Sequence, residues 1–146
     1  MSITPNRNER SKTILVVEDE ATIRYILRVV LGRMGHVVLE ASNGAEGLNL
    51  SRTFNGRIDL VISDVRMPKM DGPKMVSRIQ AERPGIRVLL ISAYSPESMP
   101  PDVAEDFLAK PFLPAAIEKK VQKMLARDAA SLGERKLASA QQWGRG

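Results

Sequence analysis

Short runs of consecutive apolar residues recur along most of the chain, and more polar stretches separate them. The runs cover residues 14–17, 37–39, 60–62, 88–91 and the weaker 107–108. Their apolar positions are consecutive rather than alternating, which is typical of parallel strands that are covered on both faces. The pattern therefore predicts five buried strands.

Between these runs, apolar residues recur at steps of three and four, which is the spacing of one face of a helix. The first such segment carries Ile23, Ile26, Leu27, Val30, Leu31 and Met34. Gly32 and Gly35 predict its end. Further helices are expected after residue 43, over 73–83 and over 114–125.

Strand–helix units in series predict an α/β fold with one five-stranded, parallel, doubly wound sheet and right-handed crossovers. We expect the flavodoxin-like strand order 2-1-3-4-5. The segment between the fourth and fifth strands departs from the other units because it contains Pro100 and Pro101. Proline inside a helix removes hydrogen bonds, so we expect a shortened fourth helix of one or two turns at most, or none.

The composition is that of a globular protein. Of the 146 residues, 43% are hydrophobic and none is cysteine, so disulfides and thiolate metal sites are excluded. The apolar runs are too short to span a membrane, and the first ten residues are polar. We therefore expect a cytoplasmic protein without a membrane segment.

The formal net charge of +5 raises the question of nucleic-acid binding. Residues 1–13 carry Arg7, Arg10 and Lys12 against Glu9. Residues 127–146 carry Arg127, Arg135, Lys136 and Arg145 against Asp128 and Glu134. Most of the excess thus falls in segments that we expect to be a flexible tail (1–12) and a helical extension or disordered tail (128–146) around one domain (13–127). We expect no DNA-binding domain, since too little chain follows residue 127 for a helix-turn-helix.

Polar side chains follow four of the predicted strands directly. Glu18 and Asp19 follow the first strand, Asp64 the third, Ser92 the fourth and Lys110 the fifth. The carboxyl ends of parallel strands meet at one edge of a sheet, where open α/β sheets bind ligands. Three crowded carboxylates favour a hard divalent cation, and oxygen-only ligands suit Mg²⁺ or Mn²⁺.

The same group of residues suits phosphoryl transfer. A metal, the ammonium of Lys110 and the hydroxyl of Ser92 together neutralise the oxygens of a phosphoryl group in transfer. One carboxylate must then act as the nucleophile and form an acyl phosphate. The central position of Asp64 favours it for this role.

On these segments the chain resembles the receiver domains of two-component response regulators, over about residues 12–127. The matching segments are ILVVEDE at 14–20, LVISDVRMPKMDG at 60–72, VLLISA at 88–93 and FLAKPF at 107–112. The resemblance is to chemotaxis-regulator-like receivers, and the short segment between Ser92 and Lys110 is closest in style to the receivers of hybrid histidine kinases.

The resemblance implies a role for each matching residue. Asp64 matches the phosphorylated aspartate. Asp19 matches a direct metal ligand, Glu18 matches an acid that acts through water, and the backbone carbonyl of Arg66 matches the remaining protein ligand. These positions imply a Mg²⁺- or Mn²⁺-dependent phosphoacceptor.

The resemblance also implies a switch. Ser92 matches the switch hydroxyl, Lys110 matches the family lysine with a cis bond to Pro111, and Phe107 matches the aromatic switch residue. Arg66 and Tyr94 match two variable positions beside the phosphoryl group. We hypothesise that these two bulky side chains slow dephosphorylation.

The predicted function is that of a receiver that takes a phosphoryl group from a histidine kinase or phosphotransfer protein and switches the binding of a downstream protein, with a homodimer possible. An alternative is a detached hybrid-kinase receiver that serves as a phosphorelay intermediate or phosphate sink. We expect no enzyme activity beyond self-phosphorylation and autodephosphorylation. A phosphatase with an aspartyl nucleophile needs a second aspartate where Arg66 stands, and a flavin or nucleotide binder needs a phosphate loop where Glu18 and Asp19 stand. His36 lies away from the acids, where we expect a structural role.

Overall fold

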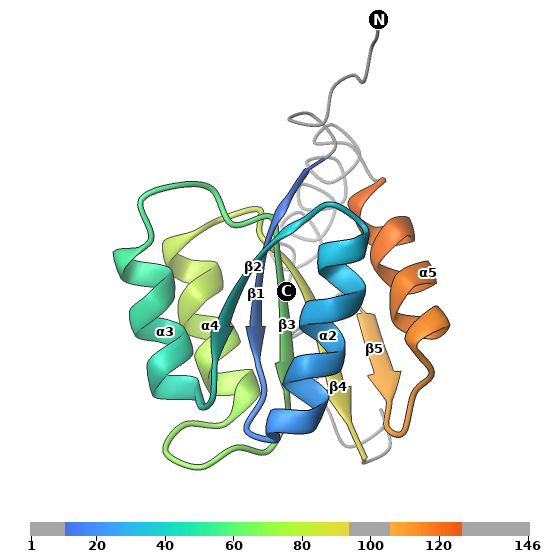
Figure 1. Cartoon of the computed structure of the whole chain (residues 1–146). Coiled ribbons are helices and arrows are strands. Elements are labelled where there is room, and N and C mark those ends of the chain that lie inside the picture. The colour runs from blue at the N-terminus through green and yellow to red at the C-terminus, as the bar shows by residue number, and fades with distance from the viewer. Residues whose placement is uncertain (1–10, 94–105, 127–146) are drawn as a thin grey trace, which may run out of the picture.

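The computed structural model of the chain describes residues 11–93 and 106–126 (Figure 1). The elements in this part of the chain are β1 (Thr13–Val17), α2 (Ala21–Arg33), β2 (Val37–Ala41), α3 (Gly44–Thr53), β3 (Leu60–Asp64), α4 (Gly72–Glu82), β4 (Arg87–Ser92), β5 (Asp106–Ala109) and α5 (Pro114–Leu125). All five predicted strands and the helices expected after strands one, two, three and five are confirmed. The expected shortened fourth helix, like Tyr94, falls on residues 94–105 and lies outside the described residues.

The strands form one parallel sheet in the order β2-β1-β3-β4-β5, as predicted. The register pairs Val17 with Ser63, Asp64 with Ile91, and Ser92 with Ala109. The chain leaves β1, β3, β4 and β5 at the same edge of the sheet because these strands are parallel. Neighbouring strands β1 and β3 thus bring residues 18–20 next to Asp64.

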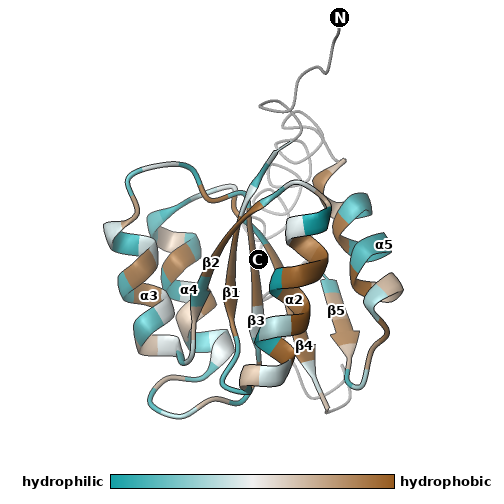
Figure 2. Ribbon diagram, in the orientation of Figure 1, coloured by the Kyte–Doolittle hydropathy of each residue, from teal (hydrophilic) through white to brown (hydrophobic). Residues whose placement is uncertain are grey.

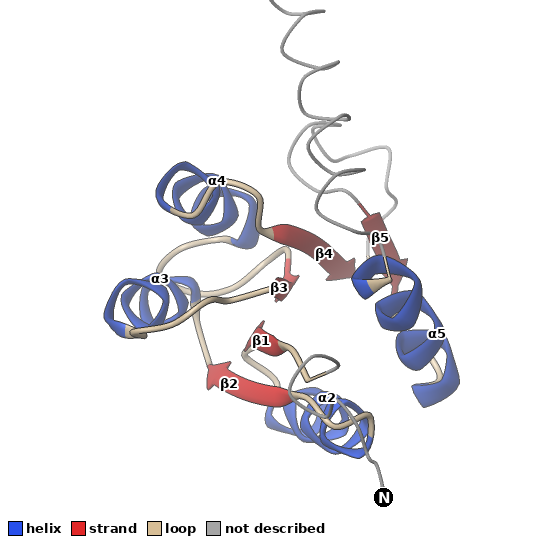
Figure 3. Cartoon of the chain, turned by 90° about the horizontal axis from the view of Figure 1, so that it is seen from above, coloured by secondary structure: helices blue, strands red, loops and turns tan. Residues whose placement is uncertain are grey.

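Two layers of helix cover the sheet. Seen from above, α2 and α5 lie on one face and α3 and α4 on the other (Figure 3). The strands are mostly hydrophobic, with polar residues near some of their ends, whereas each helix has a hydrophobic and a hydrophilic side (Figure 2). This distribution explains why the strands appear as consecutive apolar runs in the sequence and the helices as periodic segments.

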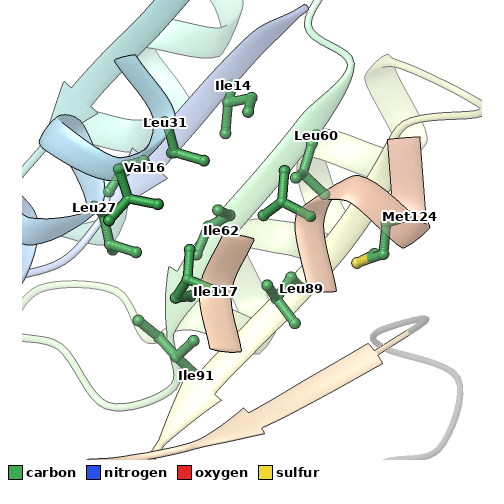
Figure 4. Packing of buried hydrophobic residues seen from close by; sticks show 12 residues of the cluster. Ile14, Val16, Leu27, Leu31, Leu60, Ile62, Leu89, Ile91, Ile117 and Met124 are labelled. Atoms are coloured by element: carbon green, nitrogen blue, oxygen red, sulfur yellow. The ribbon is translucent and has the colours of Figure 1, made fainter. Parts of the chain in front are cut away.

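Each face of the sheet has its own core. On the first face, side chains of α2 and α5, such as Leu27, Leu31 and Ile117, pack on Val16 and Ile62 of the central strands (Figure 4). On the second face, residues of α3 and α4 pack on the alternate side chains of the same strands. Every one of the five residues named from the first core is fully buried. The two cores fix the sheet on both sides and so fix the edge that carries the acids.

Capping residues define where the helices begin and end. The side chain of Asn43 accepts a hydrogen bond from the backbone of Glu46 at 2.8 Å at the start of α3, and Asp71 does the same for Lys74 at 2.9 Å at the start of α4. Gly35 has a positive φ of 89° and ends the turn after α2, as its sequence position predicts. Among the described residues, no helix has the length and apolar content needed to cross a membrane.

Candidate functional site

The carboxyl edge of the sheet brings three acidic side chains together. Glu18, Asp19 and Asp64 each offer a carboxylate oxygen, and these oxygens all lie within 4.8 Å of one another. Glu18 and Asp64 are buried, whereas Asp19 is exposed. The convergence predicted from the strand ends is therefore confirmed in position.

Glu18 has no exposed surface at all. Its Oε2 accepts a hydrogen bond from the backbone N–H of Glu20 at 3.0 Å, and its Oε1 lies 2.9 Å from Nζ of Lys110 without hydrogen-bond geometry. Burial raises the pKa of Glu18 to about 7, although Lys110 and the Glu20 N–H act against this rise; the nearby charge of Asp64 adds to it. Near neutral pH this side chain is thus poised between its charged and neutral forms.

Lys110 lies at the centre of the acidic group. Its Nζ donates to Oδ2 of Asp64 at 3.0 Å and also lies 3.6 Å from Oε1 of Glu20. Burial disfavours the charged form of Lys110, but the contacts with Glu18 and Asp64 outweigh burial and raise its pKa above the ordinary value. The bond from Lys110 to Pro111 is cis, as the family resemblance implied. The ammonium therefore stays charged and compensates two buried carboxylates.

Asp64 ends β3 and is 7% exposed. Its Oδ1 accepts a hydrogen bond from the backbone N–H of Val65 at 2.8 Å, while its Oδ2 faces Lys110. Both carboxylate oxygens thus have a fixed direction. The loop 65–71 then returns to the end of the strand, where the N–H of Gly72 donates to the carbonyl of Val65 at 2.8 Å.

The return of this loop depends on Gly72. A Cβ atom at Gly72 would lie 2.1 Å from the carbonyl oxygen of Asp64, which is closer than any side chain permits. Met67 and Met70 are partly buried and pack against the core on the α3 and α4 face, which helps to hold the loop. Gly72 therefore lets helix α4 begin in direct contact with the end of β3.

The remaining predicted residues lie at or near the same edge. Ser92 ends β4 and is 1% exposed, and its carbonyl accepts a hydrogen bond from the N–H of Lys110 at 2.8 Å. Phe107 is half-buried in β5 and packs against the core on the α3 and α4 face. Arg66 is exposed, two residues after Asp64. The switch and tuning roles of these residues stay predictions.

His36 lies at the opposite edge of the sheet, between α2 and β2. Its Nδ1 accepts a hydrogen bond from the backbone N–H of Lys12 at 3.1 Å. Burial lowers the pKa of His36 below its ordinary value, and the nearby charge of Lys12 acts in the same direction while Asp59 opposes both. The histidine is therefore remote from the acids and joins the start of β1 to the start of β2.

One residue beside the site received no role from the sequence. Arg24 on α2 donates a hydrogen bond from Nη1 to the backbone carbonyl of Glu18 at 2.6 Å. The signal available in the sequence was its position in the first two turns of the helix that follows the acids. A basic residue on an amphipathic helix is common, however, and the sequence does not show which way it points.

The donor set fits a hard divalent cation. The acidic group offers only oxygen atoms, and one of them, Oε1 of the buried Glu18, receives no hydrogen bond. Carboxylate oxygens are the ligands that Mg²⁺ and Mn²⁺ prefer in proteins. The residues expected to bind metal therefore have a suitable chemistry and arrangement.

Residues 14–122 match the family described as the response regulator receiver domain. The chain belongs to this family. The family match confirms the predicted family, and the strand order confirms the predicted fold. Receiver domains are the phosphoacceptors of two-component systems. The matched region spans between 13% and 51% of the length of the first curated relatives.

Three relatives illustrate how this receiver compares with known proteins. The sensor kinase CckA of Brucella abortus (strain 2308) is 35% identical over 121 residues, which are 80% of this chain and 13% of that protein. The structure of the chemotaxis response regulator CheY4 of Vibrio cholerae has a TM-score of 0.71 and 32% identity, and the match covers 78% of this receiver and 98% of CheY4.

The third relative is the response regulator TrrA from Thermotoga maritima, whose structure is described as a complex with Mg²⁺-BeF. It has a TM-score of 0.68 and 33% identity, with 77% of this receiver and 98% of TrrA covered. The receiver is thus similar both to a segment of a kinase and to separate response regulators.

Proposed function

We propose that Asp64 is the phosphoacceptor of this receiver and that a phosphohistidine of a histidine kinase or phosphotransfer protein is the donor. The observation that carries the proposal is the buried carboxylate of Asp64, 3.0 Å from the ammonium of Lys110 and grouped with two further acids. A carboxylate oxygen of Asp64 attacks phosphorus, the P–N bond to the histidine breaks, and the imidazole leaves with its electron pair.

Glu18, Asp19, Asp64 and the backbone carbonyl of Arg66 would hold the metal ion. When bound, Mg²⁺ or Mn²⁺ neutralises negative charge on the phosphoryl oxygens and so permits attack by an anionic carboxylate. The exposed position of Asp19 leaves it accessible to an ion from solvent, while Glu18 contributes from beneath the surface. The carboxylates of Glu18 and Asp19 would thus bind the same ion beside Asp64.

Lys110 has two successive roles in this proposal. Before transfer, its ammonium compensates the charges of Glu18 and Asp64. After transfer, the carboxylate of Asp64 has become an acyl phosphate, and a phosphoryl oxygen becomes the stronger partner for the ammonium. The hydroxyl of Ser92 donates to a second phosphoryl oxygen, and Phe107 follows this movement from the neighbouring strand.

Two exposed hydrophobic side chains mark where the donor protein docks. Tyr25, in the first two turns of α2, is 56% exposed, and Leu113, directly before α5, is 73% exposed. Helices α2 and α5 lie side by side on one face of the sheet (Figure 3), and both begin at the edge that carries Asp64 (Figure 1). A partner that covers this end of the two helices brings its phosphohistidine to the site.

The phosphorylated receiver acts in the cytoplasm through protein partners. Its similarity to part of the sensor kinase CckA supports a place in a phosphorelay or as a phosphate sink, while its similarity to CheY4 supports a switch that binds a downstream protein or a second copy. We propose no turnover of an external substrate. Arg66 occupies the position where an aspartyl phosphatase needs an acid, which argues against that activity.

The test is incubation with acetyl phosphate or phosphoramidate and MgCl₂, followed by intact-mass spectrometry. We expect one added phosphoryl group on the wild type, none with EDTA and none on Asp64→Asn. Asp71→Asn is the matched control, because asparagine also caps a helix and should keep the adduct. The absence of any adduct on the wild type with both donors would contradict the proposal, as would an adduct that survives in Asp64→Asn.

A further inference from the structure

The short segment that carries Glu18 and Asp19 is held by backbone contacts on several sides. The N–H of Glu18 donates to the carbonyl of Ala41 at 3.0 Å, which ties the segment to the end of β2. The N–H of Glu20 donates to the side chain of Glu18 at 3.0 Å. The third contact is the hydrogen bond from Arg24 to the carbonyl of Glu18 at 2.6 Å.

Arg24 is well placed to hold this carbonyl. Its own N–H donates to the carbonyl of Glu20 at 3.0 Å, so it stands one helical turn after the acids. Its side chain is 23% exposed, and its Nε lies 3.7 Å from Oε1 of Glu40. The carboxylate of Glu40 therefore steadies the guanidinium from the β2 side while Nη1 reaches the acidic segment.

The contact between Arg24 and Glu18 acts on the peptide unit that joins the two metal acids. The carbonyl of Glu18 and the N–H of Asp19 belong to the same planar peptide group. Fixing the carbonyl therefore fixes how the backbone turns from Glu18 to Asp19. Glu20, at the start of α2, makes no side-chain cap of its own, and its N–H donates to the side chain of Glu18 rather than to this carbonyl.

We propose that Arg24 is a positioning residue for the metal site: its guanidinium sets the orientation of the peptide between Glu18 and Asp19 and thereby directs both carboxylates toward Asp64. This inference rests on the proposed function, because it assumes that these acids bind Mg²⁺. Groups that hold metal ligands in place typically change metal affinity by about 10- to 100-fold when they are removed.

Because Arg24 is positively charged, the direction in which Mg²⁺ affinity changes on its replacement distinguishes positioning from charge repulsion. A guanidinium near the acids repels a divalent cation, so removing the positive charge alone would strengthen Mg²⁺ binding. Loss of positioning has the opposite effect and weakens binding. A weaker affinity in a variant without the guanidinium therefore cannot be explained by charge.

Arg28 provides a matched control on the same helix. Its Nε lies 3.8 Å from Oε2 of Glu40, so it shares the acidic partner of Arg24. The described contacts of Arg28 are with Glu40 and with the ring of Tyr25, whose centroid is 5.2 Å from its Cζ. Arg28→Gln thus removes an arginine paired with Glu40, without removing the contact between Arg24 and Glu18.

The experiment is a titration of the full chain with MgCl₂, followed by ¹⁵N–¹H NMR of the amides near Asp19 and Asp64. We expect Arg24→Gln to bind Mg²⁺ about 10- to 100-fold more weakly than the wild type, Arg28→Gln to bind it like the wild type, and Arg24→Lys to fall between. Without metal, the Asp19 amide signal should move in Arg24→Gln and stay in place in Arg28→Gln. Thermal unfolding in EDTA reports whether each variant is folded.

Equal or tighter Mg²⁺ binding by folded Arg24→Gln would overturn the positioning role and leave the proposed function intact. Failure of the wild type to bind MgCl₂ would overturn both. If Arg24→Gln does not fold, Arg24→Lys decides the question: weaker binding than the wild type supports the role, and an unchanged affinity overturns it.

Discussion

Nζ of Lys110 lies 2.9 Å from Oε1 of Glu18, a side chain with no exposed surface. Even so, burial raises the pKa of Glu18 to about 7, so the ammonium only partly offsets the loss of hydration. The charged form of this carboxylate therefore lowers the stability of the folded protein. Functional sites commonly retain such groups at the expense of stability.

Replacing Glu18 should stabilise the metal-free protein at alkaline pH. A carboxyl whose pKa rises on folding contributes stability below its unfolded pKa, here 4.5, and this contribution is lost as the pH rises through about 7. We expect Glu18→Gln in EDTA to be more stable than the wild type by about 1–2 kcal/mol at pH 8, with a higher midpoint of thermal unfolding. At pH 4.5 the difference should be small or reversed. A lower unfolding midpoint for Glu18→Gln at pH 8 would contradict the reading of Glu18 as a costly charge.

Gly72→Ala should damage the site without changing any of its polar groups. The new methyl group would lie 2.1 Å from the carbonyl oxygen of Asp64 and 3.0 Å from Oγ of Ser63, so the start of α4 or the end of β3 must move. We expect a loss of about 1–3 kcal/mol in the free energy of unfolding and slower phosphorylation by acetyl phosphate. Urea unfolding and intact-mass time courses measure the two effects.

The control for this variant is Gly32→Ala. A Cβ atom at Gly32 would have no neighbour within 4 Å, and the residue lies in the last turn of α2. Alanine favours a helix over glycine by up to about 1 kcal/mol, so this variant should be as stable as the wild type or more stable. Equal stabilities for Gly72→Ala and Gly32→Ala would show that the close approach to Asp64 is not restrictive.

His36 should make the protein less stable in acid. Because burial lowers its pKa in the folded state, the unfolded chain binds a proton more readily, and stability falls as the pH drops below the ordinary value of 6.5 toward the folded pKa. His36→Asn should remove this dependence while keeping an acceptor for the N–H of Lys12. The measurement is the difference in unfolding free energy between wild type and variant from pH 8 to pH 5, since the difference cancels the opposite trend of Glu18. A difference that is constant over this range would refute the assignment.

Arg66 and Tyr94 should set the lifetime of the phosphoryl group. Arg66 is exposed two residues after Asp64, where a long side chain hinders the approach of water. We expect the double variant Arg66→Ala, Tyr94→Ala to lose the phosphoryl group several-fold faster than the wild type at the same Mg²⁺ concentration. Loss of phosphate from the purified phosphorylated protein measures the rate. An unchanged half-life would show that neither side chain shields the site.

The fold and the positions of the acids were predictable because both follow from local patterns. A strand buried on both faces needs consecutive apolar residues, so β1, β3 and β4 are visible directly in the sequence. The polar residues at the carboxyl ends of these strands must lie at the sheet edge, which is why Glu18 and Asp64 could be brought together across 46 positions. Because the strands were predicted to be parallel, their carboxyl ends were expected at one edge of the sheet.

Contacts between distant side chains were not predictable in the same way. In the sequence, Arg83 only precedes the proline that ends α4, yet its guanidinium donates to the carbonyls of Ser51 and Phe54 at 2.8 and 3.0 Å. It thereby supplies hydrogen-bond donors to backbone carbonyls at the end of α3, some thirty residues earlier. The hydrogen bond from Arg24 to Glu18 is similar, because it depends on the rotamer of a long side chain and on the packing of α2. Such details follow from the assembled structure rather than from periodicity.

Both ends of the described receiver fold lie at the edge of the sheet remote from Asp64. β1 begins at this edge, α5 ends there, and Lys12 and Ala126 line one groove. Segments grafted before β1 or after α5 therefore join the described domain at the edge of the sheet opposite Asp64. The points of attachment are thus separated from the chemistry by the length of the sheet, which is the arrangement that a modular domain needs.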